Sequence, residues 1–431
     1  MKDAQAKTRN PWAWVSTLYF AQGIPYVVVM TVSVIMYKRM GISNTDIALY
    51  TSWLYLPWVI KPLWSPFVDM FRTKRFWIVS LQLIIGASLA GVALTIPMPA
   101  FFQYTLAVFW LMAFSSATHD IAADGFYMLA LEQHQQAAFV GVRSTFYRLA
   151  MITGQGILVV LAGYIETNSG GNISLAWSVT FGVLAALFIS FFIYHKFVLP
   201  YPMSDKPTLR DGSQGVVQEF FRTFLLFFKK KEIYAILAFL LLYRFAEAQL
   251  VKLVSPFLLD ARDKGGLGLT TSEVGIVYGT VGIMALTLGG LLGGYVVAKR
   301  GLKFWLWIMV CVIHLPDAMF IYLSQVQPEN FILINAAVAI EQFGYGFGFT
   351  AYMLFMIMVS EGEHKTAHYA ICTGFMALGM MIPGMFSGAL QEMIGYQSFF
   401  IWVVISTIPG FIVAALVKVD PEFGKKKEQA G

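Results

Sequence analysis

The stretch FWIVSLQLIIGASLAGVALTI, residues 76–96, contains no charged residue and directly follows the basic pair Lys74 and Arg75. A helix that spans a lipid bilayer needs about 20 mainly apolar residues, so this stretch predicts a membrane-spanning helix. The whole chain has the same character, with 58% hydrophobic and only 13% charged residues. Soluble domains carry about 25% charged residues, so we expect much of the surface of this protein to face lipid.

Similar apolar segments recur along the chain. Together they predict twelve spanning helices, at residues 12–37, 46–69, 76–96, 101–130, 141–166, 173–198, 232–259, 271–298, 302–325, 330–359, 365–392 and 396–418. The fold class that we expect is therefore an all-α integral membrane protein with twelve transmembrane helices in two six-helix pseudo-repeats. The N-terminal segment lacks a short apolar core followed by a small-residue cleavage site, so we expect no signal peptide.

The distribution of the 30 Lys and Arg residues predicts the orientation in the membrane. Most of them fall on the same side of the helix map as the N-terminus. Basic residues accumulate on the cytoplasmic side, so we expect both termini in the cytoplasm. The net charge of +6 then reflects orientation beside the lipid bilayer and does not indicate nucleic-acid binding. The exceptions are four residues on the opposite side and four within helices: Lys38, Arg39, Arg262, Lys264, Lys61, Arg148, Arg244 and Lys252.

The longest polar stretch divides the chain into two halves. We expect an N-terminal six-helix half at 1–199, a cytoplasmic linker at 200–231, a C-terminal six-helix half at 232–420 and a cytoplasmic basic tail at 421–431. Within the linker, residues 216–228 form either an amphipathic helix on the inner leaflet or a solvated connection.

The two halves resemble each other weakly. Residues 20–22, Phe-Ala-Gln, recur as Phe-Ala-Glu at 245–247, and Gly154 and Gly379 share the same offset of 225. Two parallel repeats place their binding site between the halves at the middle of the membrane, which makes this chain a candidate transporter.

Ionisable side chains within spanning helices are the first candidates for function, because a charge in a bilayer is costly unless it faces a cavity or a partner. Asp120 and Asp124 lie four residues apart and share one helix face. Two carboxylates this close in a low dielectric favour binding of a proton, so the pair is a candidate for carrying protons or binding a substrate amine. The alternative is a structural pair bound to Arg143 or Arg148.

The second half has its own ionisable candidates. Arg244 and Glu247 are three residues apart and are expected to pair within one helix. Arg244 either lines a cavity and binds a carboxylate or phosphate, or the pair only lowers the cost of insertion. Glu341 is a candidate coupling carboxylate, and the glycines in the sequence that follows it, at 344–348, are expected to serve helix packing. Asp317 is a further membrane carboxylate, to which the sequence assigns no role.

A charged segment follows the second predicted helix. Asp69 precedes the basic residues Arg72, Lys74 and Arg75. Such a carboxylate can pair with an arginine or a helix N-terminus in one conformation and release it in another, so these four residues are a candidate conformational latch. The alternative is that the basic residues only follow the positive-inside rule.

Enzyme signatures are missing from the sequence. It contains no zinc-ligand spacing, phosphate-binding loop or nucleophile elbow. Cys311 and Cys372 lie in apolar runs and are expected to be buried core thiols. We therefore expect no catalytic residues, no metal site and no cofactor.

Several motifs resemble a known family. Twelve helices with a charged segment after the second resemble the major facilitator superfamily. The segments KPLWSPFVD at 61–69, ATHDIAAD at 117–124 and GVRSTFYR at 141–148 look like the AmpG-type muropeptide permeases, in a group that also contains acetyl-CoA transporters. The resemblance covers nearly the whole chain.

This resemblance implies proton-driven import of N-acetylglucosaminyl-anhydro-N-acetylmuramyl peptides across a bacterial inner membrane, by a monomer. The proton would be the coupling ion, and a glycopeptide or sugar the small-molecule partner. The residues expected to couple protons are Asp120, Asp124, Glu247 and Glu341. Those expected to bind the substrate are Tyr19, Gln22, Tyr26, Arg148, Arg244, Lys252 and Gln342.

Other functions remain open at this point. The same fold could carry another sugar, an oligosaccharide, acetyl-CoA or a drug. From other classes, a membrane-embedded transferase could use His119 with Asp120 as a base, and a receptor would bind its ligand without transporting it. The repeat of the two halves and the missing nucleophile or metal constellation argue against the transferase.

Overall fold

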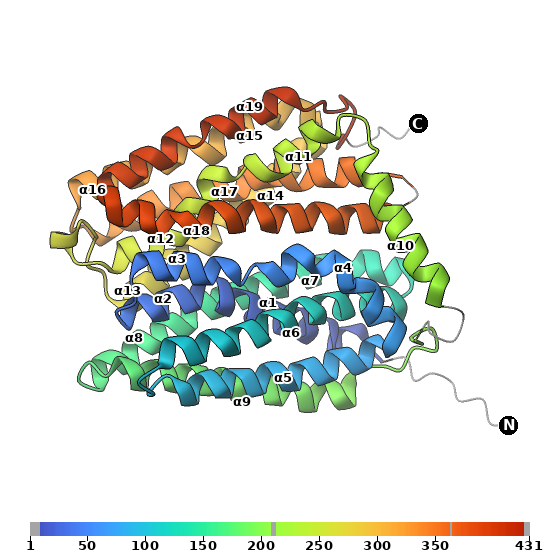
Figure 1. Cartoon of the computed structure of the whole chain (residues 1–431), viewed down its shortest axis with the longest axis horizontal. Helices are drawn as coiled ribbons and strands as arrows, with labels where there is room; N and C mark the ends of the chain where they lie inside the picture. The colour runs from blue at the N-terminus through green and yellow to red at the C-terminus, as the bar shows by residue number, and fades with distance from the viewer. Residues whose placement is uncertain (1–8, 208–212, 363, 426–431) are drawn as a thin grey trace. The chain divides into compact units, whose positions relative to one another are not determined.

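The computed structural model describes residues 9–207, 213–362 and 364–425. Regular secondary structure in these ranges is entirely helical. The helices form two compact units: Met1–Met36 with Ile60–Phe221 make up unit 1, and Tyr37–Val59 with Arg222–Gly431 make up unit 2. Figure 1 shows the helices, coloured along the chain.

Unit 1 is built around α5, which packs against α6 and α9, while α1 packs against α6 and α7. Its buried core includes Trp14, Leu18 and Phe126. The helices that contribute to it are α1 (Val15–Val27), the π-helix η2 (Val28–Val32), α4 (Leu56–Phe71), α5 (Lys74–Thr95), α6 (Phe101–Ala130), α7 (Gln133–Ile152), the π-helix η3 (Thr153–Ile157), α8 (Leu158–Asn168) and α9 (Ile173–Val198).

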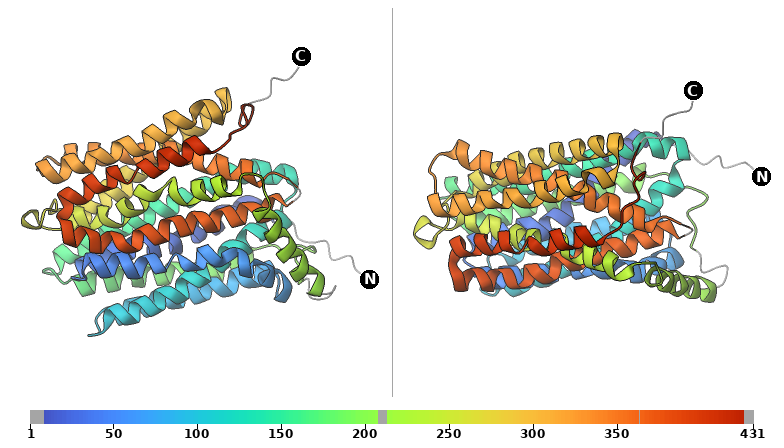
Figure 2. Two further views of the ribbon diagram at one scale, coloured as in Figure 1. Left: turned by 45° about the horizontal axis from the view of Figure 1, so that its top comes forward. Right: turned by 90° about the horizontal axis from the view of Figure 1, so that it is seen from above.

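Unit 2 has α17 packed against α14 and α15, and α18 packed against α12 and α3. Figure 2 shows α17 and α18 as long orange and red helices. The helices are α3 (Asn44–Trp53), α11 (Ile233–Leu242), α12 (Phe245–Leu259), α13 (Thr271–Val274), the π-helix η6 (Gly275–Gly282), α14 (Ile283–Arg300), α15 (Leu302–His314), η7 (Leu315–Asp317), α16 (Ala318–Val326), α17 (Phe331–Ser360), α18 (Lys365–Ile405) and α19 (Ile408–Leu416). Two further helices, α2 (Ser33–Arg39) and α10 (Ser213–Phe228), begin in unit 1 and end in unit 2.

The structure confirms the all-α membrane fold, with ten helices in the described ranges that are long and apolar enough to span a bilayer. Two differences explain why ten such helices are found where the sequence predicted twelve. The segment 365–416 contains two predicted spans, separated by the non-helical Gly395 at φ 75°. The predicted helix at 46–69 is interrupted at Leu54 and Tyr55, directly before Pro57, which has no N–H to continue the hydrogen-bond ladder.

Unit 2 is discontinuous in the sequence. Residues 37–59, which contain α3, pack with unit 2, although they precede most of unit 1 in the chain. Within the expected linker, α10 spans Ser213–Phe228, and the ring of its buried Phe227 stacks on Phe375 at 6.4 Å. This segment is therefore helical, and its C-terminal end is anchored to α18.

The repeated glycines have matching roles in the two units. A Cβ atom on Gly154 would lie 2.2 Å from Cγ1 of Val27, which ends α1. A Cβ atom on Gly379 would lie 3.0 Å from the carbonyl oxygen of Leu241 in α11. Each glycine lets the first spanning helix of its half approach a later helix closely, so the offset of 225 reflects equivalent packing in each half.

Candidate functional site

Three buried carboxylates meet in unit 2. Each of Glu247, Asp317 and Glu341 offers an oxygen, and these oxygens lie within 4.8 Å of one another. All three side chains are 1% exposed. In the described part of the chain, the oxygens of Glu247 and Asp317 have no hydrogen-bond partner, whereas Glu341 accepts a hydrogen bond from the amide of Gln342 at 2.9 Å. We call Glu247, Asp317 and Glu341 the carboxylate triad.

Helix interruptions bring the triad together. Glu247 lies in the first turn of α12, which begins after a break at Tyr243 and Arg244. Asp317 lies in the 3-10 turn η7, because Pro316 cannot continue α15. Glu341 lies within the continuous helix α17. Membrane transporters commonly build their binding sites at such discontinuous helices.

Full ionisation of the triad would be costly. Two unit charges at 4.8 Å repel by roughly 3 kcal/mol at an effective dielectric constant of about 20. The buried guanidinium of Arg244 is the charge that acts electrostatically on Glu247 and offsets part of this repulsion. Partial protonation of the triad would relieve the remaining repulsion.

The expected pair of Arg244 and Glu247 does not form a hydrogen bond. The guanidinium of Arg244 donates instead to the hydroxyl of Tyr345, and it lies 4.7 Å from the centre of the Phe349 ring. The physical reason is that Arg244 caps α12 with non-helical dihedral angles, so the i, i+3 geometry of a continuous helix does not apply. Arg244 is thus a buried cation stacked on aromatic rings.

Lys252 is a second buried cation of unit 2. Its side chain is 2% exposed, and its Nζ donates to Oγ1 of Thr51 at 2.9 Å. The ammonium also lies 5.2 Å from the centre of the Tyr55 ring. No carboxylate lies within ion-pair distance of it in the described part of the chain. Thr51 and Tyr55 are thus neutral partners of Lys252, so a bound anion would compensate the cost of burying its charge.

The glycine-rich part of α17 serves helix packing, as the sequence pattern predicts. A Cβ atom at Gly346 would lie 1.9 Å from the carbonyl oxygen of Leu286 in α14. At Gly344 it would lie 2.3 Å from the carbonyl oxygen of Val312 in α15. Helices α14 and α15 thus both pack closely against α17 near Glu341 and Gln342.

In unit 1, Asp124 has two partners. It accepts a hydrogen bond from the hydroxyl of Tyr19 at 3.0 Å and forms an ion pair with Arg143 at 2.9 Å. The Arg143 guanidinium also lies 4.4 Å from the centre of the Tyr19 ring. The structure thus joins α1, α6 and α7 through these three residues. For Asp124, the geometry therefore shows the alternative that the sequence left open, an aspartate bound to Arg143.

Asp120 pairs with a different cation. Its carboxylate lies 3.6 Å from Nζ of Lys61 in α4. Both aspartates of unit 1 therefore form an ion pair. The neighbouring His119 belongs to a separate buried chain, in which its Nε2 lies 3.2 Å from the side-chain nitrogen of Gln82.

The other expected substrate residues of unit 1 lie on α1 and α7. Gln22 is buried, and its side-chain oxygen has no hydrogen-bond partner. Tyr26 lies one turn further along α1 and is partly exposed. Arg148 is partly exposed on α7. Gln22 is the residue of these three with an unsatisfied polar atom.

The expected conformational latch is bound by a carboxylate, Asp205, to which the sequence pattern assigned no role. Asp205 accepts hydrogen bonds from the backbone N–H groups of Lys74 at 2.7 Å and Arg75 at 3.0 Å, at the N-terminus of α5. The Arg75 side chain lies 3.8 Å from the centre of the Tyr201 ring, and Arg72 lies 5.4 Å from that of Phe76. The side chain of Asp69 is outside the described part of the structure.

Two residues important to these sites were not assigned a role from the sequence. Asp317 was recognised as a membrane carboxylate, and its position beside a helix-breaking proline was the available signal. Asp205 lies in a polar segment whose contact with α5 is not visible from local pattern. Both residues gain their role from chain segments far away in sequence.

Comparisons with known proteins agree with this architecture. The family model described as Major Facilitator Superfamily matches residues 15–360. The chain is 25% identical over 413 residues to the anhydromuropeptide permease of Escherichia coli, covering 94% of this chain and 79% of that protein. It is 26% identical to a Rickettsia conorii protein provisionally named transporter AmpG 4, covering 92% of this chain and 94% of that one.

Solved structures show the same fold. The D-xylose–proton symporter matches with a TM-score of 0.71 at 13% identity, covering 96% of this chain and 99% of the symporter. The nucleoside transporter NupG matches with a TM-score of 0.64 at 15% identity, covering 94% and 98%. These relatives are transporters and not enzymes, which confirms that expectation. The chain belongs to the major facilitator superfamily of membrane transporters and is similar to its AmpG proteins.

Proposed function

We propose that this protein is a proton-coupled importer of peptidoglycan-derived muropeptides. Its substrates are N-acetylglucosaminyl-anhydro-N-acetylmuramyl peptides, and it works by alternating access in a bacterial inner membrane. The similarity to a permease named for anhydromuropeptides supports the substrate class. The protein acts as a monomer with both termini in the cytoplasm and without a cofactor.

The carboxylate triad carries the proposal of proton coupling. Its three side chains are buried and close together. A proton satisfies this arrangement, and its release on one side of the membrane converts the triad to a charged state that disfavours the same conformation. Glu247 and Glu341 are thus proton-coupling residues, and Asp317 joins them. In this proposal Asp120 and Asp124, each in an ion pair in unit 1, also take part in proton coupling.

The buried cations support an anionic substrate. Muropeptides carry carboxylates on the peptide, together with sugar hydroxyls and acetamides. Arg244 and Lys252 supply positive charge in unit 2. The remaining hydrogen-bonding groups of the proposed binding set come from both halves: Tyr19, Gln22, Tyr26, Arg148 and Gln342.

The test is uptake of labelled anhydro-muropeptide into proteoliposomes that contain the purified protein. We expect accumulation when the lumen is alkaline relative to the outside, and only equilibration without a gradient. Unlabelled N-acetylglucosaminyl-anhydro-muramic acid should compete. A sodium gradient in place of the proton gradient is the decisive control, since accumulation driven by sodium alone would show that the triad binds a metal cation. Absence of any uptake by folded protein would exclude the muropeptide assignment.

A further inference from the structure

Helix α10 has one face that packs on protein. Its Phe227 is fully buried, and the centre of the Phe227 ring lies 5.5 Å from that of His368 and 6.4 Å from that of Phe375. Nε2 of His368 also donates to the backbone carbonyl of Thr223 at 3.3 Å. Positions 223 and 227 are four residues apart and share one helix face, so this face of α10 rests on α18.

The opposite face of α10 is apolar and exposed. Phe221, Leu225 and Phe228 are 58%, 60% and 36% exposed, and a spacing of four and then three residues places them in one stripe along the helix. Arg222, beside this stripe, is exposed as well. An exposed apolar stripe flanked by basic residues is typical of a helix that lies in the membrane interface, with the stripe among the acyl chains.

Three lysines fix the level of this helix. Lys229, Lys230 and Lys231 separate α10 from α11, and the membrane-spanning segment begins two residues later, at Ile233. Two residues reach at most about 7 Å, so the lysines lie at the membrane surface. Tyr234, in the first turn of α11, is 86% exposed, as is typical of an aromatic side chain at the level of the headgroups. With the termini in the cytoplasm, as the charge distribution predicts, this surface is that of the inner leaflet.

The positive charge of these lysines is not neutralised by the described part of the protein. Lys229 and Lys231 are exposed and form no ion pair with another described residue. The adjacent acid, Glu232, is paired with Lys418 at 2.5 Å instead. Two exposed lysines without an acidic partner attract an anion from outside the chain.

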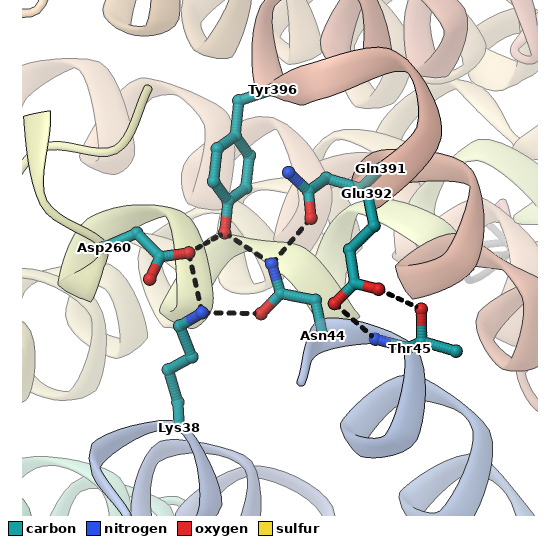
Figure 3. Close-up of polar contacts among 7 residues, drawn as sticks. All are labelled: Lys38, Asn44, Thr45, Asp260, Gln391, Glu392 and Tyr396. Atoms are coloured by element: carbon teal, nitrogen blue, oxygen red, sulfur yellow. Dashed lines mark hydrogen bonds and ion pairs between the residues drawn. The ribbon is translucent and has the colours of Figure 1, made fainter. Parts of the chain in front are cut away.

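The opposite end of the same span, within unit 2, has a different arrangement (Figure 3). There Lys38 lies 2.7 Å from Asp260, and the hydroxyl of Tyr396 donates to the same carboxylate oxygen at 2.7 Å. The side-chain amide of Asn44 donates to Gln391 at 2.6 Å. These polar groups satisfy one another within the protein, so the counter-charge that the lysines before α11 lack is already supplied at this end.

We propose that α10 and the lysines that follow it bind anionic phospholipids of the inner leaflet. The acyl chains cover Phe221, Leu225 and Phe228, and the phosphates bind Lys229 and Lys231. A phospholipid supplies both components, whereas a free phosphate ion leaves the apolar stripe in water. The proposal holds whichever solute the transporter carries.

Quenching by brominated lipids tests this proposal. Leu225→Cys is made in a background in which Cys311 and Cys372 are replaced by alanine, and a bimane fluorophore is attached to it. The labelled protein is placed in vesicles in which either phosphatidylcholine or phosphatidylglycerol carries bromine, a quencher that acts at contact. The ratio of the two quenching constants measures the preference of this surface for the anionic lipid. The parent should prefer phosphatidylglycerol by about 30-fold at low salt, because each of the two lysines contributes about 1 kcal/mol near an anionic headgroup.

The double variant Lys229→Gln with Lys231→Gln removes the charge and keeps the apolar stripe. It should lose the preference for phosphatidylglycerol while both brominated lipids still quench the bimane. Replacement of both lysines by arginine should keep the preference. The matched control is Lys303→Gln, which changes an exposed lysine of α15 and should leave the ratio unchanged. Each variant must elute as a single peak in detergent.

Two outcomes would contradict the proposal. Equal quenching by the two lipids in the parent would exclude an anionic lipid site at the lysines. Absence of quenching by either lipid would mean that the stripe faces water, which excludes the membrane contact itself. The readout needs no substrate, so it stays informative even if muropeptide uptake fails.

Discussion

Nζ of Lys252 in α12 donates a hydrogen bond to Oγ1 of Thr51 in α3 at 2.9 Å, and both side chains are buried. This contact connects α3 to a cation that we propose binds the substrate. An anionic group that binds the Lys252 ammonium would compete with Thr51 for its hydrogens.

Removal of the Lys252 charge tests its role in substrate binding. Lys252→Gln should raise the KM for anhydro-muropeptide by roughly 30-fold, because a hydrogen bond to a charged group contributes about 2 kcal/mol. Lys252→Arg should keep a large part of the affinity. The measurement is the concentration dependence of uptake in proteoliposomes. As a control, Lys264→Gln changes an exposed lysine and should have no effect; an equal KM for both glutamine variants would remove Lys252 from the binding site.

The carboxylate triad predicts a separation of coupling from transport. Asp317→Asn should lower gradient-driven accumulation by about tenfold and leave exchange of labelled for unlabelled substrate intact, because an amide keeps the shape but binds no proton. Glu247→Gln and Glu341→Gln should behave in the same way. The two assays are performed on the same proteoliposomes. If accumulation by Asp317→Asn equals that of the parent, the triad does not carry the coupling proton.

Substitution of Arg244 probes the aromatic stack. Arg244→Lys keeps the charge but loses the planar group that lies over Phe349 and donates to Tyr345. We expect a reduction in uptake of about tenfold, since a compact ammonium does not stack or donate in a fixed fork. Tyr345→Phe, which removes only the acceptor, should have a smaller effect. Equal uptake by Arg244→Lys and the parent would mean that charge alone is required.

Asp205 should contribute to the stability of unit 1. It accepts from two backbone N–H groups at the N-terminus of α5, and loss of such a cap costs about 1 kcal/mol. Asp205→Ala should therefore lower the melting temperature of the detergent-solubilised protein by about 2–4 °C. Asp263→Ala removes an exposed carboxylate and serves as the comparison. A shift no larger than that of the comparison would show that the cap is energetically neutral.

The membrane fold could be predicted from local sequence. A run of apolar residues such as 76–96 has few alternatives to a spanning helix, because lipid offers no partners for an unpaired backbone. The glycines beside Glu341 were likewise expected to pack helices, since small residues in a spanning helix have that effect wherever they occur.

The sites depended on information that local pattern does not contain. The pairing of Arg244 with Glu247 was inferred from helical spacing, and the break at Tyr243 and Arg244 removed that geometry. Asp317 joins Glu247 and Glu341 only through the packing of three helices. The contact between Asn44 and Gln391 joins residues 347 positions apart, so no window of sequence reports it.

That separation also constrains how the protein is made. At roughly 5–20 residues per second, synthesis of the 347 residues between Asn44 and Gln391 takes roughly 20–70 s. Throughout that time α3 exists in the membrane without a complete α18, and the amide of Asn44 must find temporary partners. The chain therefore passes through a stage with α3 undocked from α18 every time it is synthesised.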